Sequence, residues 1–315
     1  MNPAFSVVLF TTLAGAAQGL LLALFALDWA VKSLWLNVQP SNHTFVVGAG
    51  LAAALATLGL IASFAHLGRP ERAWRAASQW RTSWLSREVI VLPGFIGLCL
   101  AYGYSHHVGS PLSVWIGALA AGAALLLFLC TGMIYVAIRF LREWSTPLTP
   151  INFTLLGCAI GFTLASAMAA ALEPLVLHFW GTGAFISTLL ALVVRLSLWQ
   201  RIRTLTPKSN LQTAIGIKHP KIKQTSQGFM GGSFNTKEFF HGRTPALLRA
   251  LKRFCLVTAF GLPLGVLWLL VMQIQVALAL LLAVFLLQWL GQLAERWLFF
   301  AEAQHPQNLY YQKMA

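Results

Sequence analysis

The sequence predicts an all-α integral membrane protein built as a bundle of eight transmembrane helices. Of its 315 residues, 58% are hydrophobic and only 10% are charged, whereas ordinary globular domains carry roughly 25% charged residues. The charges also fall into a few segments that separate long uncharged runs. A soluble chain of this length would need more polar surface to cover itself, so lipid is the solvent that suits this composition.

Eight uncharged runs are long enough to cross a membrane, which takes about 20 apolar residues in a helix. We expect a single membrane domain over 1–315, with a basic loop at 200–253. The helices are predicted at about 4–30, 44–66, 88–105, 113–139, 150–172, 174–199, 254–273 and 275–299. Glu173-Pro174 separates the fifth from the sixth, because proline disfavours helix in the preceding residue. The polar Gln273 and Gln275 divide the last long run into a hairpin.

The basic residues predict how the bundle sits in the membrane. With eight helices, both termini lie on one side, together with the segments that follow helices two, four and six. That side holds five Lys and Arg in 67–88, two in 139–149 and twelve in 195–253, while the other side holds only Lys32. Basic loops face the cytoplasm. We therefore expect both termini and the basic loops to be cytoplasmic, in a bacterial cytoplasmic (inner) membrane.

The same features argue against several other classes. A net charge of +14 would suggest nucleic acid in a soluble protein, but here it follows membrane topology or partner docking. The four cysteines form no C-x-x-C, so we expect no iron–sulfur cluster or metal in this chain. We expect no haem either, because the histidines at 43, 106, 107 and 178 fall near the outer helix ends and form no mid-helix pair.

The segment between helices two and three carries the candidate site. Residues 66–88 hold five arginines, three tryptophans, one histidine and two glutamates within 23 residues. His66 ends helix two and Glu88 begins helix three, so a short connection brings them together. A quinone needs proton donors at its carbonyl oxygens, and a histidine with a partly buried carboxyl can supply them. The alternatives remain that Trp and Arg are interface anchors and that a His66–Glu88 hydrogen bond only fixes the loop.

Two strings in this segment resemble a known family. Ser63-Phe-Ala-His-Leu-Gly-Arg-Pro70, followed by Ala73-Trp74, and Ser83-Trp-Leu-Ser-Arg-Glu88 are similar to the signature of the dimethyl sulfoxide reductase anchor-subunit family. The resemblance implies eight helices without haem, and electron transfer between an iron–sulfur subunit and membrane quinone, beside a molybdopterin catalytic subunit. It implies a quinone-binding role for His66 and Glu88. Arg69, Trp84, Ser86 and Arg87 are further quinone-binding candidates.

Other strings resemble the anchors of the sulfite-oxidising members of that family. They are Thr213-Ala-Ile-Gly-Ile-Lys-His-Pro220, the Gly-rich 228–240 and Ala294-Glu-Arg-Trp-Leu-Phe-Phe-Ala-Glu-Ala303. The charge count agrees, since it places the motif-bearing face in the cytoplasm, whereas the sulfoxide reductases of the family expose their catalytic subunits on the other side. Basic loops can also be basic because they dock an acidic partner. The candidate docking residues are Arg72, Arg75, Arg81, Lys218, Lys221, Lys223 and Lys237.

The sequence therefore predicts a non-catalytic anchor that passes electrons from the iron–sulfur subunit to ubiquinone or menaquinone, during cytoplasmic sulfite oxidation to sulfate. Three alternatives stay open. The same architecture can run backwards, as a quinol-oxidising anchor of a sulfoxide or related reductase. The basic loop can be a flexible cytoplasmic loop with no docking role. A transporter is a third, although transporters carry charged residues at the midplane, and we see none in the predicted helices.

Overall fold

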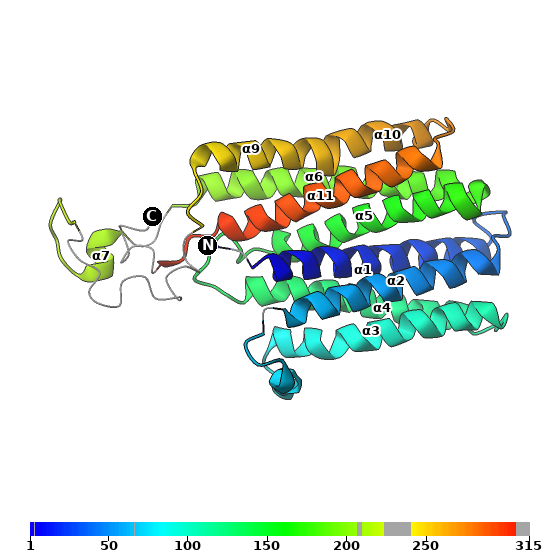
Figure 1. The fold of residues 1–315 in the computed structure, drawn as a ribbon, viewed down its shortest axis with the longest axis horizontal. Helices are drawn as coiled ribbons and strands as arrows, with labels where there is room; N and C mark the ends of the chain where they lie inside the picture. The colour runs from blue at the N-terminus through cyan, green and yellow to red at the C-terminus, as the bar shows by residue number, and fades with distance from the viewer. Residues whose placement is uncertain (3, 66, 207–209, 224–240, 307–315) are drawn as a thin grey trace.

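The chain folds into a bundle of long helices that run side by side, as Figure 1 shows. The computed structural model describes residues 1–306, except 3, 66, 207–209 and 224–240. Within that part of the chain no strand occurs, and eight helices are long and apolar enough to cross a membrane. The predicted all-helical fold with eight spans is confirmed for these residues.

The first five spans are single helices. They are α1 (Phe5–Lys32), α2 (Asn42–Phe64), α3 (Trp84–His107), α4 (Ser113–Val136) and α5 (Leu148–Leu172). Serine side chains cap two of them: Ser41 accepts from the backbone of His43 at the start of α2, and Ser83 accepts from that of Ser86 at the start of α3. Such caps satisfy amide groups that have no partner within the helix.

The last three spans are less regular. A 3-10 turn, η2 (Pro174–Val176), leads into α6 (Leu177–Thr204), and the short α7 (Leu211–Ile215) follows in the basic loop. The seventh span joins α9 (Pro245–Cys255), the π-helical η3 (Leu256–Gly261) and α10 (Leu262–Val271). The final span is α11 (Leu278–Ala301). The hairpin before it turns at 272–277, where Gln273 adopts a φ of 58°.

Small residues allow the central helices to approach closely. A Cβ atom on Gly19 of α1 would lie 1.9 Å from the carbonyl oxygen of Gly157 in α5, and one on Gly161 would lie 2.1 Å from the carbonyl carbon of Gly19. The backbones therefore touch where α1 crosses α5. Such small-residue crossings drive helix association in membranes, where burial of apolar surface supplies no force between helices. Helix α1 consequently forms the centre of the bundle, with contacts to α2, α4, α5 and α11.

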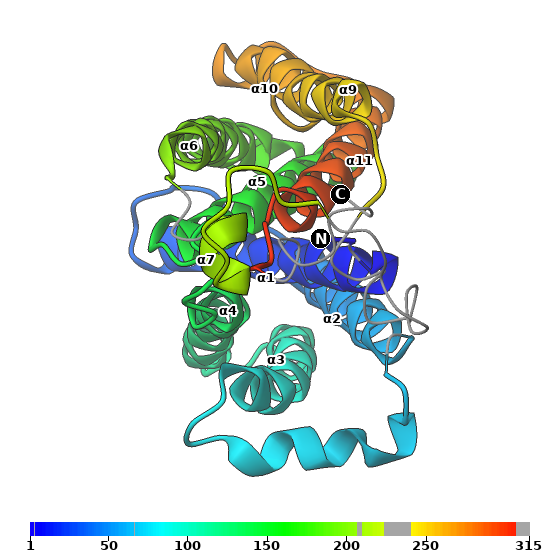
Figure 2. The same cartoon turned by 90° about the vertical axis from the view of Figure 1, so that its left-hand side faces the viewer.

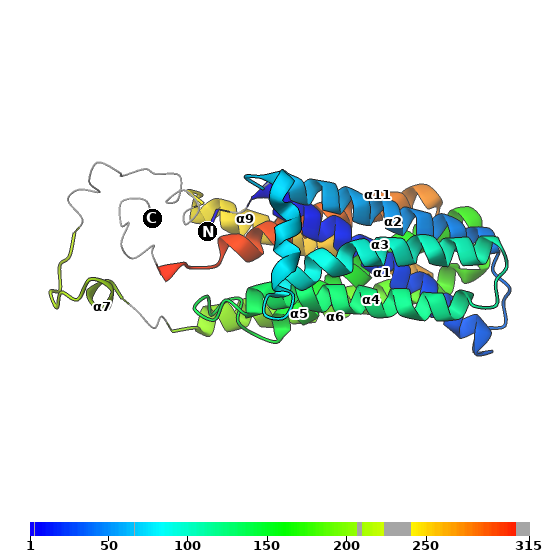
Figure 3. The ribbon, with the colours of Figure 1, turned by 90° about the horizontal axis from the view of Figure 1, so that it is seen from below.

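One end of the bundle carries most of the basic residues, and we call it the basic end. The amine of Met1 donates to the carbonyl oxygens of Ala301 and Ala303, at 3.3 and 3.1 Å, so the start of α1 meets the end of α11 there. The 3-10 helix η1 (Pro70–Gln79) lies at the same end, across the helix axes and beside α2 and α3 (Figure 2). Helix α7 lies beyond the bundle at this end (Figure 3).

Candidate functional site

Glu88 is the best-defined of the predicted site residues. It lies in the second turn of α3, with 5% of its surface exposed. Its Oε1 accepts a short hydrogen bond from the hydroxyl of Thr131 on α4. Its Oε2 has no hydrogen-bond partner among the described residues. Leu85 and Ile90 on the same helix are half exposed, so apolar surface reaches the outside of the bundle close to this carboxyl.

Arg87 fastens the start of α3 to the end of the preceding connection. Its Nε donates to the carbonyl of Trp80 at 2.9 Å, and its Nη2 donates to that of Arg81 at 2.8 Å. The guanidinium also lies over the ring of Trp84, 4.2 Å from its centroid. These contacts hold the loop against α3 one residue before Glu88. Ser86, in the same turn, is buried.

The remaining predicted residues are exposed or lie outside the described part. His66 and Lys237 fall outside the described residues. Arg69 precedes η1 and is exposed, as are Arg72, Arg75 and Arg81. Arg75 and Arg81 each lie over the tryptophan that precedes them, at 5.5 and 5.3 Å. Lys218, Lys221 and Lys223 are exposed in the loop beyond α7. The arginines of η1 therefore form a cationic, tryptophan-rich surface at the basic end.

The sequence analysis did not anticipate a charge cluster buried at the basic end. Arg195 of α6 lies 3.2 Å from Glu295 and 3.3 Å from Glu302, and Lys252 of α9 lies 2.5 Å from Glu302. Arg296 pairs with the other oxygen of Glu295. Arg195, Glu295 and Arg296 are at most 3% exposed. The sequence analysis looked for charged residues at the membrane midplane, whereas this cluster lies at the basic end of the bundle.

Neutral side chains complete this cluster. Asn152 of α5 donates to Glu295 at 3.0 Å, and the indole of Trp199 donates to Glu302 at 3.2 Å. The guanidinium of Arg296 lies 3.8 Å above the ring of Phe153. Four helices thus contribute to one buried network. The sequence could have shown that these charged residues need partners, because a charge inside an apolar run is costly in lipid, but not which residues pair.

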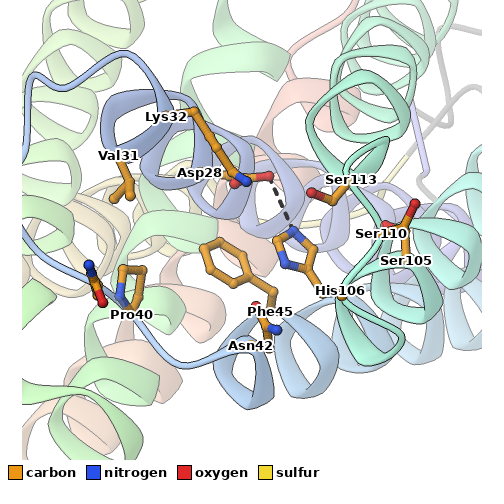
Figure 4. A pocket seen from close by; sticks show the side chains of 12 residues that line it. Asp28, Val31, Lys32, Pro40, Asn42, Phe45, Ser105, His106, Ser110 and Ser113 are labelled. Carbon is orange, nitrogen blue, oxygen red and sulfur yellow. Dashed lines mark hydrogen bonds and ion pairs between the residues drawn. The ribbon is translucent and has the colours of Figure 1, made fainter.

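A second buried polar group lies at the opposite end of the bundle. Oδ2 of Asp28 on α1 accepts from the hydroxyl of Tyr102 at 3.1 Å and lies 3.2 Å from Nε2 of His106, both on α3. The ring of Phe45 stacks on His106 at 4.2 Å. Asp28, Phe45 and His106 line a cavity of about 270 Å³, shown in Figure 4. The sequence analysis considered His106 only as a haem ligand and did not consider Asp28.

Within the described residues, no three His, Cys, Asp or Glu side chains lie close enough together to hold a metal ion. What the site offers at the basic end is a buried carboxyl beside lipid-facing apolar surface, under a cationic connection. Such a carboxyl can exchange a proton or a hydrogen bond with the polar head of an apolar molecule. Donors and acceptors of that kind fix the orientation of a ligand in an otherwise apolar setting.

The eight apolar helices found in the described part of the chain define a multi-pass membrane protein. The chain belongs to the DMSO reductase anchor subunit (DmsC) family, whose sequence pattern matches residues 1–301. It is also similar to a sulfite dehydrogenase subunit of Allochromatium vinosum, with 49% identity over an alignment that covers 100% of both chains. The predicted family resemblance is confirmed, and so is the predicted likeness to its sulfite-oxidising members.

Proposed function

We propose that this chain is the quinone-binding membrane anchor of a sulfite-oxidising molybdoenzyme and passes electrons from a docked iron–sulfur subunit to quinone. Its likeness over the full length to a sulfite dehydrogenase subunit supports sulfite as the substrate of the complex. Glu88 carries the quinone-binding part of the proposal, because it is a buried carboxyl with one oxygen left without a partner among the described residues. Membrane-embedded ionisable groups are costly and tend to serve function.

In this proposal Glu88 holds the proton that a quinone oxygen takes up, and Thr131 fixes the direction of the carboxyl. His66 is the second proton-handling residue. Arg69, Trp84, Ser86 and Arg87 shape the headgroup site or hold its walls. Arg87 does so through its bonds to the carbonyls of Trp80 and Arg81. The electron acceptor is the quinone, either ubiquinone or menaquinone.

The iron–sulfur subunit docks at the basic end, and the molybdopterin catalytic subunit attaches through it. Exposed Arg72, Arg75 and Arg81 on and beside η1 offer a cationic surface next to Glu88. We expect Lys218, Lys221, Lys223 and Lys237 of the basic loop to take part in docking as well. Charge complementarity with acidic groups speeds and directs association. Because cytoplasmic loops carry excess Lys and Arg, we place this end and both termini in the cytoplasm, with the chain in the inner membrane.

Glu88→Gln in the assembled complex tests the proposal. The amide keeps the acceptor for Thr131 but holds no exchangeable acid proton, so quinone reduction by sulfite should fall at least tenfold while all subunits still copurify. Glu71→Gln is the matched control, since Glu71 is an exposed carboxyl of η1 and its loss should leave the rate unchanged. Normal turnover in a fully assembled Glu88→Gln complex would remove Glu88 from the mechanism.

The alternative is a quinol-oxidising anchor of a sulfoxide or related reductase. The family match alone is equally compatible with it. The two proposals differ in the side that the basic end faces, because the sulfoxide-type enzyme carries its partner subunits outside the cytoplasm. A reporter enzyme inserted in the loop between α6 and α9 distinguishes them: activity on the cytoplasmic side supports sulfite oxidation, and activity outside supports the reductase.

A further inference from the structure

The helix η1 lies where the surface of a membrane meets the bundle. Figures 1, 2 and 3 agree that it runs across the axes of the spans, outside the bundle and level with the first turns of α3. It packs against α3, the span at that edge. Lipid surrounds the spans of a membrane protein, so a helix beside their ends has lipid on one side and water on the other. Its surface therefore has to suit both solvents.

The 3-10 geometry of η1 sorts its side chains into three rows, because about 3 residues make one turn and positions i and i+3 lie above one another. Trp80 has a φ of −58° and a ψ of −26°, so the turn continues beyond Gln79. The first row begins at Pro70 and holds two half-buried alanines, Ala73 and Ala76. The second row is polar and exposed, and consists of Arg72, Arg75, Ser78 and Arg81. The third row consists of Glu71, Trp74, Ala77 and Trp80. The helix thus has one small, one cationic and one aromatic side.

The aromatic row exposes large apolar rings. Trp74 is 70% exposed and Trp80 is 53% exposed. The nearby ends of α2 and α3 also expose apolar side chains, Phe64 and Leu85, so the aromatic row continues the lipid-facing surface of the spans. Tryptophan is enriched at the boundary between membrane and water, where its ring sits among the lipid headgroups. Glu71, the charged member of this row, lies at its start and pairs with Arg72 at 3.9 Å.

The cationic row stands beside the aromatic row. The guanidinium of Arg75 lies 5.5 Å from the ring centroid of Trp74, and that of Arg81 lies 5.3 Å from that of Trp80. Arginine keeps its charged head in water while its stem covers apolar surface. A helix with tryptophan on one side and arginine on the other has the composition of helices that lie in the plane of the membrane interface.

We propose that η1 binds the surface of the lipid bilayer at the basic end, with Trp74 and Trp80 among the lipid headgroups and the cationic row turned to the aqueous phase. This goes beyond the proposed function, in which the arginines alone have a role, and leaves those arginines free for a docked subunit. It also sets the depth of Glu88. The carbonyl of Trp80 accepts from Arg87 on α3 at 2.9 Å, so the residue that enters the lipid surface holds the start of α3.

Spin labels on the full chain, reconstituted in lipid bilayers, test this placement. A nitroxide is attached at Trp74→Cys and, as the matched control, at Ser78→Cys in the cationic row of the same helix. Molecular oxygen concentrates in lipid and a nickel chelate stays in water, so the ratio of the two collision rates reports the surroundings of each label. We expect that ratio to be at least tenfold higher at position 74 than at position 78. The unchanged chain measures the background from the four native cysteines.

Equal ratios at the two positions overturn the inference. A label at position 74 that neither oxygen nor nickel reaches also overturns it, because protein and not lipid would then cover the aromatic row. Trp80→Cys lies in the same row and gives the same readout if Trp74→Cys does not insert into the bilayer. The proposed function is tested separately by turnover of Glu88→Gln, so a failure of this inference leaves that result unaffected.

Discussion

Arg195 and Glu295, on helices α6 and α11, form an ion pair of 3.2 Å with at most 1% of either side chain exposed. Together with Asn152 of α5, they join three helices that are far apart in the sequence. Glu295 pairs with both Arg195 and Arg296, and Arg195 also pairs with Glu302. The pair therefore acts as the centre on which the second half of the bundle is assembled at the basic end.

Replacing Glu295 by Gln should destabilise the bundle strongly. The change leaves Arg296 buried without a counter-charge, and breaking one side of a buried pair costs about 3–5 kcal/mol. Thermal unfolding of the complex in mild detergent should show the loss as a lower midpoint. Arg203→Gln is the control and should change little, because Arg203 is an exposed cation on α6, the helix that carries Arg195. Equal stability of both variants would show that the network contributes nothing to the fold.

The close crossing of α1 and α5 gives a second prediction. Gly161→Ala would place a methyl group 2.1 Å from the backbone of Gly19, and backbone cannot move aside as a side chain can. Overpacking typically costs about 1–3 kcal/mol, and we expect the upper end of that range, seen as reduced membrane yield and a lower unfolding temperature. Gly50→Ala on α2 is the control, because no atom lies within 4 Å of its added methyl. A stable Gly161→Ala variant would contradict the packing.

The number of spans could be predicted from sequence because it depends on the length of uncharged runs, a property that lipid imposes directly. The Glu88 region could be predicted because charged residues at a helix end stand out against apolar neighbours. Thr131 could not, since a threonine inside an apolar helix gives no signal until its partner is known. Arg195 and Glu295 are distant in the sequence, and only the assembled bundle brings them together. The close approach of α1 and α5 likewise depends on a crossing that composition does not specify.

Arg87→Lys tests whether the contact between α3 and the residues that follow η1 depends on the guanidinium of Arg87. Lysine keeps the charge, but its single ammonium cannot bond two carbonyls and cover a ring at once. The loss of one or two charged hydrogen bonds at a half-exposed site should cost about 1–2 kcal/mol locally. Backbone amide exchange at 80–84 should therefore rise about tenfold. Arg75→Lys, whose side chain lies over Trp74, should leave these amides unchanged, and equal exchange in the two variants would deny Arg87 this role.

The polar group at the opposite end gives a prediction that separates stability from turnover. In Asp28→Asn the carboxylate that receives Tyr102 and His106 is lost, and hydrogen bonds to a charged group contribute about 1.5–3 kcal/mol. We expect a less stable complex whose quinone turnover, at equal assembly, is unchanged. The physical reason is distance: at a rise of about 1.5 Å per residue, His106 lies about 27 Å from Glu88 along α3.

Glu88→Gln should show the reverse pattern, with stability retained and turnover lost, so the two variants control each other in the same assay. A loss of turnover in Asp28→Asn at full assembly would contradict the proposal that proton handling depends on Glu88 at the basic end alone. It would instead indicate that protons enter through the cavity beside Asp28 and cross the bundle. That route would have to pass the tightly buried Leu20, Leu21 and Leu24 of α1, which offer no hydrogen-bonding group. The distance of about 27 Å along α3 between the two polar groups is the physical reason to expect that Asp28→Asn affects stability alone.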